Sequence, residues 1–300
     1  MISYKADSEV ASIAEDAYIY GLQQVIFHET RFKYTQKRDS DVFVGVNRWH
    51  RPNEGQPITA DFQATVSPNA TTLYKVAFLD LQEGPVVIET PEITDQYFSL
   101  QMLDQYRTPL YAGNHFNGTD ARSYLILPDD YTGEVPGDSV AADVVQAPTK
   151  SVFTLVRYAL HDATDEAEVA HVNALQKQTT ITPLSEWLAN HHAGVPQTEQ
   201  SVVAGDYETF QRMKELTTRQ VERQTAADFF TLLSLVLNDP SISIIEDSRT
   251  ESEMLDRLVQ IGIGPELEFA WADLDEDVPE AMATGFQNGT NAPRPLAGNA

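Results

Sequence analysis

The chain has 300 residues, and 42% of them are hydrophobic, which is enough for a sizeable core; 45 acidic against 20 basic residues give a formal net charge of −25. A surface this acidic repels phosphate backbones and anionic headgroups, which argues against nucleic acid and membranes as partners. The absence of cysteine excludes disulfides, thiolate catalysis and cysteine-ligated metal. The sequence shows no run of about 18 apolar residues and no secretory signal, so we expect a cytoplasmic protein. The acidity fits either a halophilic, salt-adapted surface or ordinary solubility.

Up to residue 160, the spacing of apolar residues changes from a helical period to a strand period. Apolar residues recur at spacings of three and four over residues 8–34, which predicts a helix. Residues 36–68 have no period and contain three prolines, so we expect a long connection with short strands at 42–46 and 58–65. From residue 72 the period is two, and the expected strands are 73–81, 86–89, 97–106, 123–127 and 151–160. Many short strands joined by turn residues predict a β-sandwich or barrel.

Helical patterns return after residue 160. We expect helices over residues 164–178, 205–220, 225–240 and 251–264, and a flexible tail from residue 288. The sequence therefore predicts an α+β protein made of an N-terminal helix, a β-sandwich, a helical subdomain and the tail, with the ranges 1–35, 36–160, 161–287 and 288–300. The segment DFFTLLSLVL is apolar almost all round, so its own chain or a second subunit must bury it, and we expect a homo-oligomer.

One expected strand carries a carboxylate on its apolar face. Alternation over residues 97–106 places Asp104 beside four large side chains, which are Phe98, Leu100, Met102 and Tyr106. A buried carboxylate needs a partner, a raised pKa or access to a cleft. Asp104 therefore either forms a buried pair with an arginine or a tyrosine, or faces a ligand and acts as general base for a water molecule. Arg107 points to the opposite face of an ideal strand and reaches Asp104 only if a bulge or turn re-aims it.

No metal or cofactor motif accompanies these residues. His191 and His192 are adjacent and do not share a face, and Val278 stands where a calcium loop beginning at residue 273 needs glycine. The sequence has no nucleophile elbow, zinc-protease motif, phosphate-binding loop or dinucleotide fingerprint. We therefore expect neither a metal nor a cofactor.

Eight segments carry a family resemblance over nearly the whole chain. In order they are AYIYGL (17–22), PNATTLY (68–74), LDL (79–81), YFSLQMLDQY (97–106), APT (147–149), ITPLSEW (181–187), DFFTLLSLVL (228–237) and IGIGPELEF (261–269). Together they resemble the domain-of-unknown-function family numbered 1254. The resemblance implies an antiparallel β-sandwich of jelly-roll type flanked by helices. Many members carry a second domain, numbered 1214, directly after this one.

The chain departs from the family pattern at two positions. Thr71 stands where members usually carry an aspartate, and Gln96 stands where they usually carry an arginine. If those two residues pair in the family, their joint loss is structurally mild; if they do chemistry, this chain has an altered function. Six positions match the pattern, namely Asn69, Thr72, Tyr74, Tyr97, Gln101 and Asp104. Asn69 after Pro68 fits a turn, and its place in the family pattern suggests instead that it lines a cleft with Asp104.

Two functions of different classes remain open. The first is a small-molecule site at the open end of the sandwich for a neutral polyol, sugar or ester, in which Asp104 is the base if the site is hydrolytic. Its expected binding residues are Asn69, Tyr74, Tyr97, Gln101, Tyr106 and Arg107. The second is a non-catalytic interaction module that pairs with a separate 1214-type chain or self-associates. The polar, aromatic strand favours the first function, and the lack of a recognisable nucleophile–base pair favours the second.

Overall fold

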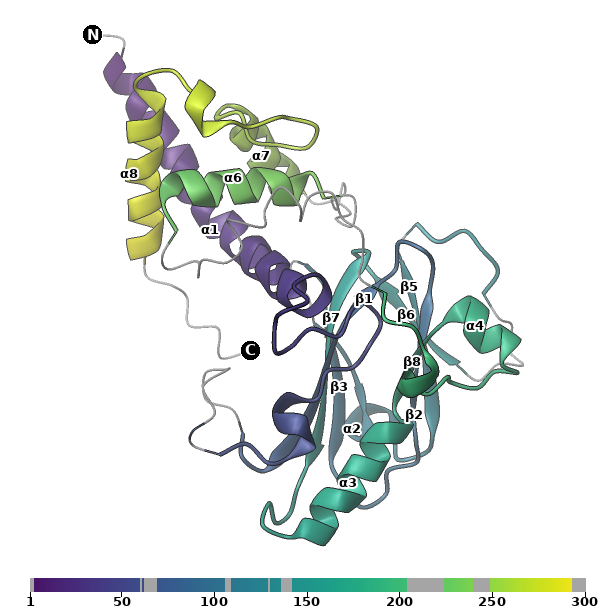
Figure 1. Cartoon of the computed structure of the whole chain (residues 1–300). Helices are drawn as coiled ribbons and strands as arrows, with labels where there is room; N and C mark the ends of the chain where they lie inside the picture. Colours follow the sequence, from purple (N-terminus) through teal and green to yellow (C-terminus); the bar gives the residue numbers. More distant parts are fainter. Residues whose placement is uncertain are drawn as a thin grey trace. The chain divides into compact units, whose positions relative to one another are not determined.

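The computed structural model describes residues 3–59, 61, 69–105, 109–128, 130–135, 142–203, 224–239 and 249–292. As expected, the chain is a mixed α+β protein with an N-terminal helix and C-terminal helices (Figure 1). It divides into two compact units. One comprises residues 31–206 and holds the strands, and the other comprises residues 1–30 together with 207–300 and holds helices.

In the described residues, eight strands form two four-stranded sheets. Sheet A has the order β1-β7-β3-β4 and consists of β1 (Thr72–Asp80), β3 (Phe98–Leu103), β4 (Pro109–Gly113) and β7 (Ser151–Ala159). Sheet B has the order β6-β5-β2-β8 and consists of β2 (Val86–Thr90), β5 (Arg122–Pro128), β6 (Ala142–Ala147) and β8 (Thr180–Pro183). The period of two located β1, β2, β3, β5 and β7, and it missed the three edge strands β4, β6 and β8.

Strand pairing differs in part from the expected antiparallel sandwich. All pairs are antiparallel except β5 with β6, which run parallel, so sheet B is mixed and the expectation is wrong there. A parallel pair needs a crossover of about a dozen residues or more, and the chain between Pro128 and Ala142 provides that length. The sheets are not closed, and the strand orders do not confirm the jelly roll implied by the resemblance.

The two sheets share one hydrophobic core. Every second residue of the central strands contributes to it: Leu73, Ala77, Leu79, Leu100, Met102, Val152, Val156 and Tyr158 from sheet A, and Val86, Ile88, Tyr124 and Ile126 from sheet B. The spacing of two follows because successive side chains of a strand point to opposite faces. On the outer face of sheet B, Val87 and Leu125 pack against Leu184 and Trp187 of α4 (Leu184–Ala189).

Helix α3 (Glu166–Gln178) closes one side of this core. Its buried face contributes Val169, Val172 and Leu175 to the cluster formed by the sheets. The helix begins at Asp165, whose carboxylate accepts hydrogen bonds from two backbone N–H groups of the first turn. The periodicity placed the helix correctly but started it one residue too early, at Thr164.

The second unit is helical. The second unit's part of α1 (Ser3–Thr35), up to residue 30, forms a separate hydrophobic cluster with α6 (Ala226–Leu237), α7 (Arg249–Val259) and α8 (Val278–Asn291). Helix α6 holds the apolar segment DFFTLLSLVL, and its side chains Phe229, Phe230, Leu232, Leu233 and Val236 are all fully buried within this cluster. Because the chain itself buries α6, the segment no longer argues for self-association, and the oligomeric state stays a prediction.

Several expected boundaries differ from the structure. The helical subdomain does not begin at residue 161, because β8 hydrogen-bonds to β2 and α3 packs on the core of the sheets. The tail expected from residue 288 begins inside α8, which extends to Asn291. Residues 42–46 form turns instead of a strand. The helix expected at 205–220 and most of the strand expected at 58–65 lie outside the described residues. No helix in the described part of the chain combines the length and the apolar character needed to cross a bilayer.

Candidate functional site

Asp104, the predicted general base, lies inside the protein. It follows β3 directly, and its exposed fraction is 0%. Its side chain is not left without a partner. Because solvent does not reach Asp104, a water nucleophile has no access to it in this structure. The geometry therefore favours the buried, partnered carboxylate over the ligand-facing base.

Two other predicted residues meet on the outer face of sheet A. Tyr74 and Gln101 occupy positions between the inward residues of β1 and β3, so they point away from the core. Arg157 of β7 stands opposite Tyr74 and donates a hydrogen bond to Gln101 Oε1 at 2.8 Å. Tyr97 is 55% exposed. The structure thus groups Tyr74 and Gln101 around an arginine that sequence reasoning did not single out.

Asn69 forms a turn. Its Oδ1 accepts hydrogen bonds from the backbone N and the Oγ1 of Thr71 at 2.8 and 2.9 Å, and its own backbone N donates to the hydroxyl of Tyr74 at 3.2 Å. Such bonds from an asparagine to the backbone two residues later define the turn expected from Pro-Asn. Tyr106, Arg107 and Pro68 lie outside the described residues.

The two departures from the family pattern flank the end of β7. Thr71 O accepts a hydrogen bond from Leu160 N at 2.8 Å, and on the other side of β7 Gln96 Nε2 donates to Glu168 Oε1 at 2.9 Å. The family's arginine at position 96 would therefore face a carboxylate of α3. Gln96 keeps a hydrogen bond to Glu168 but does not bring the positive charge of an arginine.

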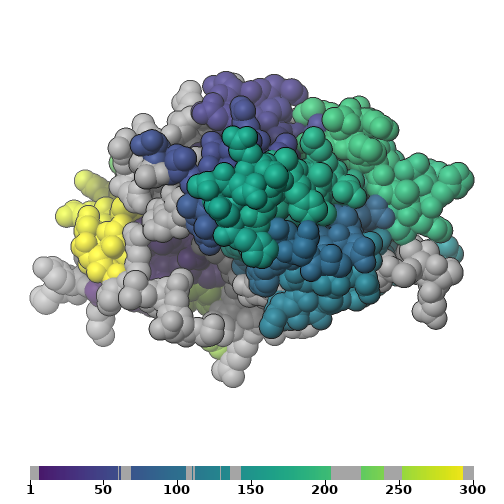
Figure 2. Space-filling view, turned by 90° about the horizontal axis from the view of Figure 1, so that it is seen from below, coloured from purple at the N-terminus to yellow at the C-terminus, as the bar shows by residue number. Residues whose placement is uncertain are grey.

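A groove of about 540 Å³ lies between residues 51–57 and α3. Figure 2 shows the teal surface of the α3 region exposed on one face of the molecule, with dark blue atoms of the region around residue 50 beside it. The groove is lined by Arg51, Gln56, Pro57, Ala163, Thr164, Glu166, Val169, Ala170, Asn173 and Lys177. Five of these lie on α3, and four of the five, Glu166, Ala170, Asn173 and Lys177, follow one another at spacings of four, three and four residues, which puts them on one face of the helix.

On the opposite wall, the lining residues Arg51, Gln56 and Pro57 flank a left-handed turn over Pro52–Gly55. Asn53 (φ 50°, ψ 35°) and Glu54 (φ 53°, ψ 24°) are both left-handed, and Gly55 follows with φ 77°. A left-handed residue other than glycine costs roughly 1–2 kcal/mol, so two in succession are strained. The amide of Asn173 holds the turn against α3 by donating to Gly55 O at 2.9 Å. Strain of this kind persists where the surrounding structure enforces it, and it concentrates at functional sites.

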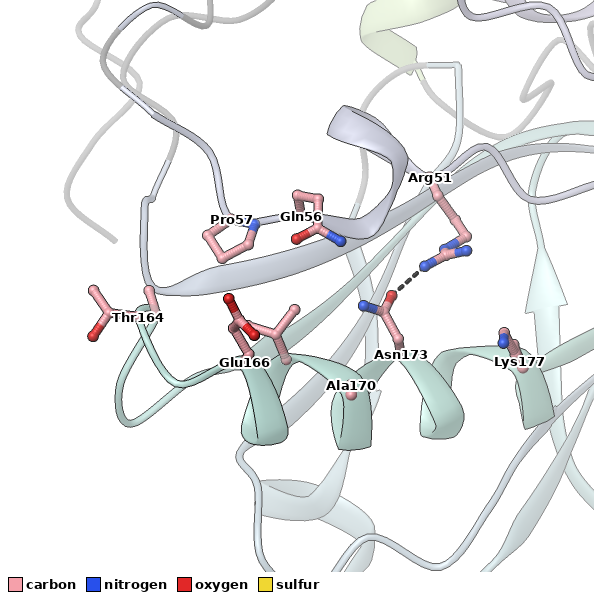
Figure 3. A pocket seen from close by; sticks show the side chains of 10 residues that line it. Arg51, Gln56, Pro57, Thr164, Glu166, Ala170, Asn173 and Lys177 are labelled. Atoms are coloured by element: carbon pink, nitrogen blue, oxygen red, sulfur yellow. Dashed lines mark hydrogen bonds between the residues drawn. The ribbon is translucent and has the colours of Figure 1, made fainter.

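The side chain of Arg51 is fixed in the groove by two neutral acceptors. Figure 3 shows Arg51 and Asn173 pointing toward one another from the two walls, and the guanidinium donates to Asn173 Oδ1. Its Nε donates to Gln176 Oε1 at 3.2 Å. Gly55 leaves room for this arrangement, since a Cβ there would lie 2.8 Å from Arg51 Cζ. In the part of the chain that the structure describes, Arg51 forms no ion pair with a carboxylate.

A buried lysine supports the same end of α3. Lys75 of β1 is 4% exposed, and its Nζ donates to Gln176 O at 2.5 Å and to Thr179 O at 2.7 Å. These carbonyl groups lie at the end of the helix, where Gln176 O also accepts from Thr179 N at 3.3 Å, and a cation there complements the helix dipole. Burial, and then the positive charge of Arg51, hold the pKa of Lys75 well below its usual range.

Sequence reasoning missed the groove for two different reasons. The positions of Glu166, Ala170, Asn173 and Lys177 form a helical stripe that could have been found beside the apolar stripe of α3. Arg51 gives no such signal, because it lies in the aperiodic segment 36–68 and only tertiary contact brings it to α3.

Residues 49–183 match a family model described as protein of unknown function (DUF1254). This part of the chain belongs to the DUF1254 family. All the residues that line the groove, from Arg51 to Lys177, fall within the DUF1254 stretch. The resemblance expected from the sequence is thereby confirmed. None of the curated proteins matches the chain.

Two solved structures are similar to this chain. The VPA0106 protein from Vibrio parahaemolyticus matches with a TM-score of 0.63 and 20% identity over 94% of this chain, which spans 58% of that protein. An uncharacterized protein from Burkholderia cenocepacia matches with a TM-score of 0.31 and 11% identity, over 61% of this chain and 50% of that one. The likeness to VPA0106 shows a common fold.

Proposed function

We propose that this DUF1254 domain binds a small polar molecule in the groove beside α3. The observation that carries the proposal is the strained turn at Asn53 and Glu54, which Asn173 pins to the wall of a cavity of about 540 Å³. The turn places Arg51 inside the groove, and such strain is kept where it positions a group. The volume falls in the range of small-molecule sites, roughly 300–1,000 Å³.

The proposal is for binding and not for hydrolysis. The expected base Asp104 is fully buried, and it does not line the groove. The expected site at the open end of the sandwich also lacks support, because Asn69 forms a turn and Tyr74 points away from the core of the two sheets. A polyol, a sugar or an ester fits the hydrogen-bonding groups of the groove. We therefore propose for the groove the ligand classes that were expected at the open end of the sandwich.

A thermal-shift screen tests the groove. Polyols, sugars, esters, carboxylates and divalent ions are screened against wild type, Asn173→Ala and the control Asn190→Ala, since a ligand of the native state raises the melting temperature. Asn190 lies outside the groove at the end of α4, where its amide donates to Ala193 O. We expect a stabilising ligand whose effect is lost in Asn173→Ala and kept in Asn190→Ala. Ligands that stabilise both variants as they do wild type would place the site elsewhere.

A second candidate function is that of an interaction module. Two aromatic side chains of the β unit are exposed, Tyr97 at 55% and Phe116 at 64%. Aromatic anchors of this type are enriched in protein interfaces. A second copy of the chain or a separate 1214-type chain would cover them. Light scattering of wild type and of the double variant Tyr97→Ser, Phe116→Ser tests self-association, and a monomeric wild type would contradict it.

A further inference from the structure

Arg51 keeps hydrogen-bond donors for a ligand. A guanidinium has five N–H donors in a planar fork. In this structure Nε donates to Gln176 and one Nη2 proton to Asn173. Among the described residues, no partner takes the two protons of Nη1 or the second proton of Nη2, and one proton from each of these nitrogens forms the end of the fork. A carboxylate matches that end because its two oxygens accept two parallel N–H bonds.

The net charge of the residues that line the groove indicates which net charge of the ligand binds best. Arg51 and Lys177 are cationic and Glu166 is the one carboxylate among the lining residues, so the groove has a net charge of +1 within a chain of −25. Among the described residues, Lys177 also has no ion-pair partner. A monoanion neutralises the groove. A dianionic phosphate ester overcompensates it and is repelled by Glu166, and a zwitterion leaves it charged.

The far end of the groove determines what the rest of the ligand offers. Thr164, Gln56 and Glu166 present a hydroxyl, an amide and a carboxylate there. Seven residues of helix separate Glu166 from Asn173, which corresponds to about 10 Å along the axis. Hydroxyl groups can donate to Glu166 and accept from the amide, and Pro57 and Val169 give apolar contact in between.

We infer that the groove binds a small carboxylate with a hydroxylated body, such as a sugar acid, with the carboxylate on the end of the Arg51 fork and the hydroxyls toward Glu166. The inference rests on the proposed function of the groove and adds the chemical class of its ligand.

Gln176 is the positioning residue for this anion site. It is fully buried, and its Oε1 accepts from Arg51 while its Nε2 donates to Tyr74 O at 3.3 Å. Its backbone carbonyl accepts from Lys75 Nζ. The guanidinium is therefore held by β1 and α3 before any ligand arrives, which lowers the ordering cost of binding. Arg51 depresses the pKa of Lys75, so the two cations repel each other, and a bound anion offsets that repulsion.

Calorimetric titration with four probes tests the ligand class. Gluconate, glucose, glucose 6-phosphate and 6-aminohexanoate are titrated at matched ionic strength into wild type, Arg51→Gln, Lys177→Gln and the control Arg122→Gln. Arg122 lies in sheet B, where it pairs with Asp143 at 3.1 Å. We expect gluconate to bind wild type most tightly of the four. Arg51→Gln should weaken gluconate by about tenfold or more, because a charge-assisted fork is lost, and Arg122→Gln should leave it unchanged.

Lys177→Gln keeps the test decisive if Arg51→Gln does not fold. Lys177 is exposed and makes no bond that the fold needs, so its variant should weaken gluconate a few-fold with an unchanged melting temperature. Equal binding of glucose and gluconate, or gluconate binding that ignores both Arg51 and Lys177, would overturn the ligand class. The proposed binding site in the groove would still hold if Asn173→Ala weakened the binding of whichever ligand is preferred. It would be contradicted if Asn173→Ala weakened the binding of no ligand.

Discussion

Gly55→Ala is the sharpest perturbation of the groove. Gly55 has φ 77°, and a Cβ at this position would overlap Asn173 Oδ1 and lie 2.8 Å from Arg51 Cζ. The added methyl group therefore forces Arg51 and Asn173 apart. Gly118 provides a control for the backbone cost alone, since it has φ 80° and ψ −170° and a Cβ there would meet nothing within 4 Å. Both substitutions place a side chain at a positive φ, and only the first disturbs the groove.

The loss in Gly55→Ala combines a backbone part with the contribution of the Arg51–Asn173 contact. Alanine at a positive φ costs about 1 kcal/mol or more in the left-handed region, and up to about 3 kcal/mol at φ/ψ values like those of Gly118, which are accessible almost only to glycine. Gly55→Ala also weakens the bond from Arg51 to Asn173 and the bond from Asn173 to Gly55 O, which together contribute about 2 kcal/mol at this half-exposed place. We therefore expect a loss of about 3 kcal/mol or more for Gly55→Ala, and a loss of about 1–3 kcal/mol for Gly118→Ala that comes from the backbone alone.

Urea unfolding followed by tryptophan fluorescence measures both losses. Trp49 and Trp187 lie in the same unit as both glycines, and the free energy follows from the midpoint and the slope. Gluconate titration of the two variants then separates stability from binding, since only Gly55→Ala should lose affinity. A Gly55→Ala variant that loses less than about 1 kcal/mol, or that binds gluconate as wild type does, would refute the reasoning, because the groove would then accommodate the methyl group without cost.

Three further predictions concern the support of α3. Backbone N–H groups of His161 and then Asp162 donate to Glu168 and lower its pKa from 4.5 to about 2. Since the folded pKa is the lower one, this stability is present above pH 4.5 and is lost as the pH falls toward 2; acid should therefore lower the urea midpoint of wild type more than that of Glu168→Gln. Gln96→Arg should raise the melting temperature through an ion pair with Glu168, and a gain that persists in the Glu168→Gln background would contradict this. Lys75→Met leaves two carbonyl groups at the end of α3 without their donor and should cost about 2–4 kcal/mol in urea unfolding, whereas an unchanged midpoint would show that the lysine is dispensable.

The sequence by itself determined what depends on local geometry. The period of two set Tyr74 on the opposite face of β1 from its neighbour Leu73, because a strand turns successive side chains to opposite faces whatever it pairs with. Which face turns inward depended on packing, and the structure places Leu73 and Ala77 in the core. The helical period located α1, α3, α6 and α7, because apolar residues spaced by three and four lie on one face of a helix. Pro-Asn before β1 predicted the turn at Asn69, since the asparagine bonds to its own backbone neighbours. The ordered motifs also gave the family over residues 49–183.

Only the tertiary structure decided where the groove lies. The edge strand β8 is four residues long, too short for a readable period, and it becomes a strand by pairing with β2. Asp104 was recognisable as a carboxylate on an apolar face, but its burial depends on what packs around it. Arg51 and Asn173 are 122 residues apart in the chain, and a strained turn brings them together. No local rule favours two left-handed residues in succession, because the contacts that stabilise them come from α3, and those contacts exist only once the chain has folded.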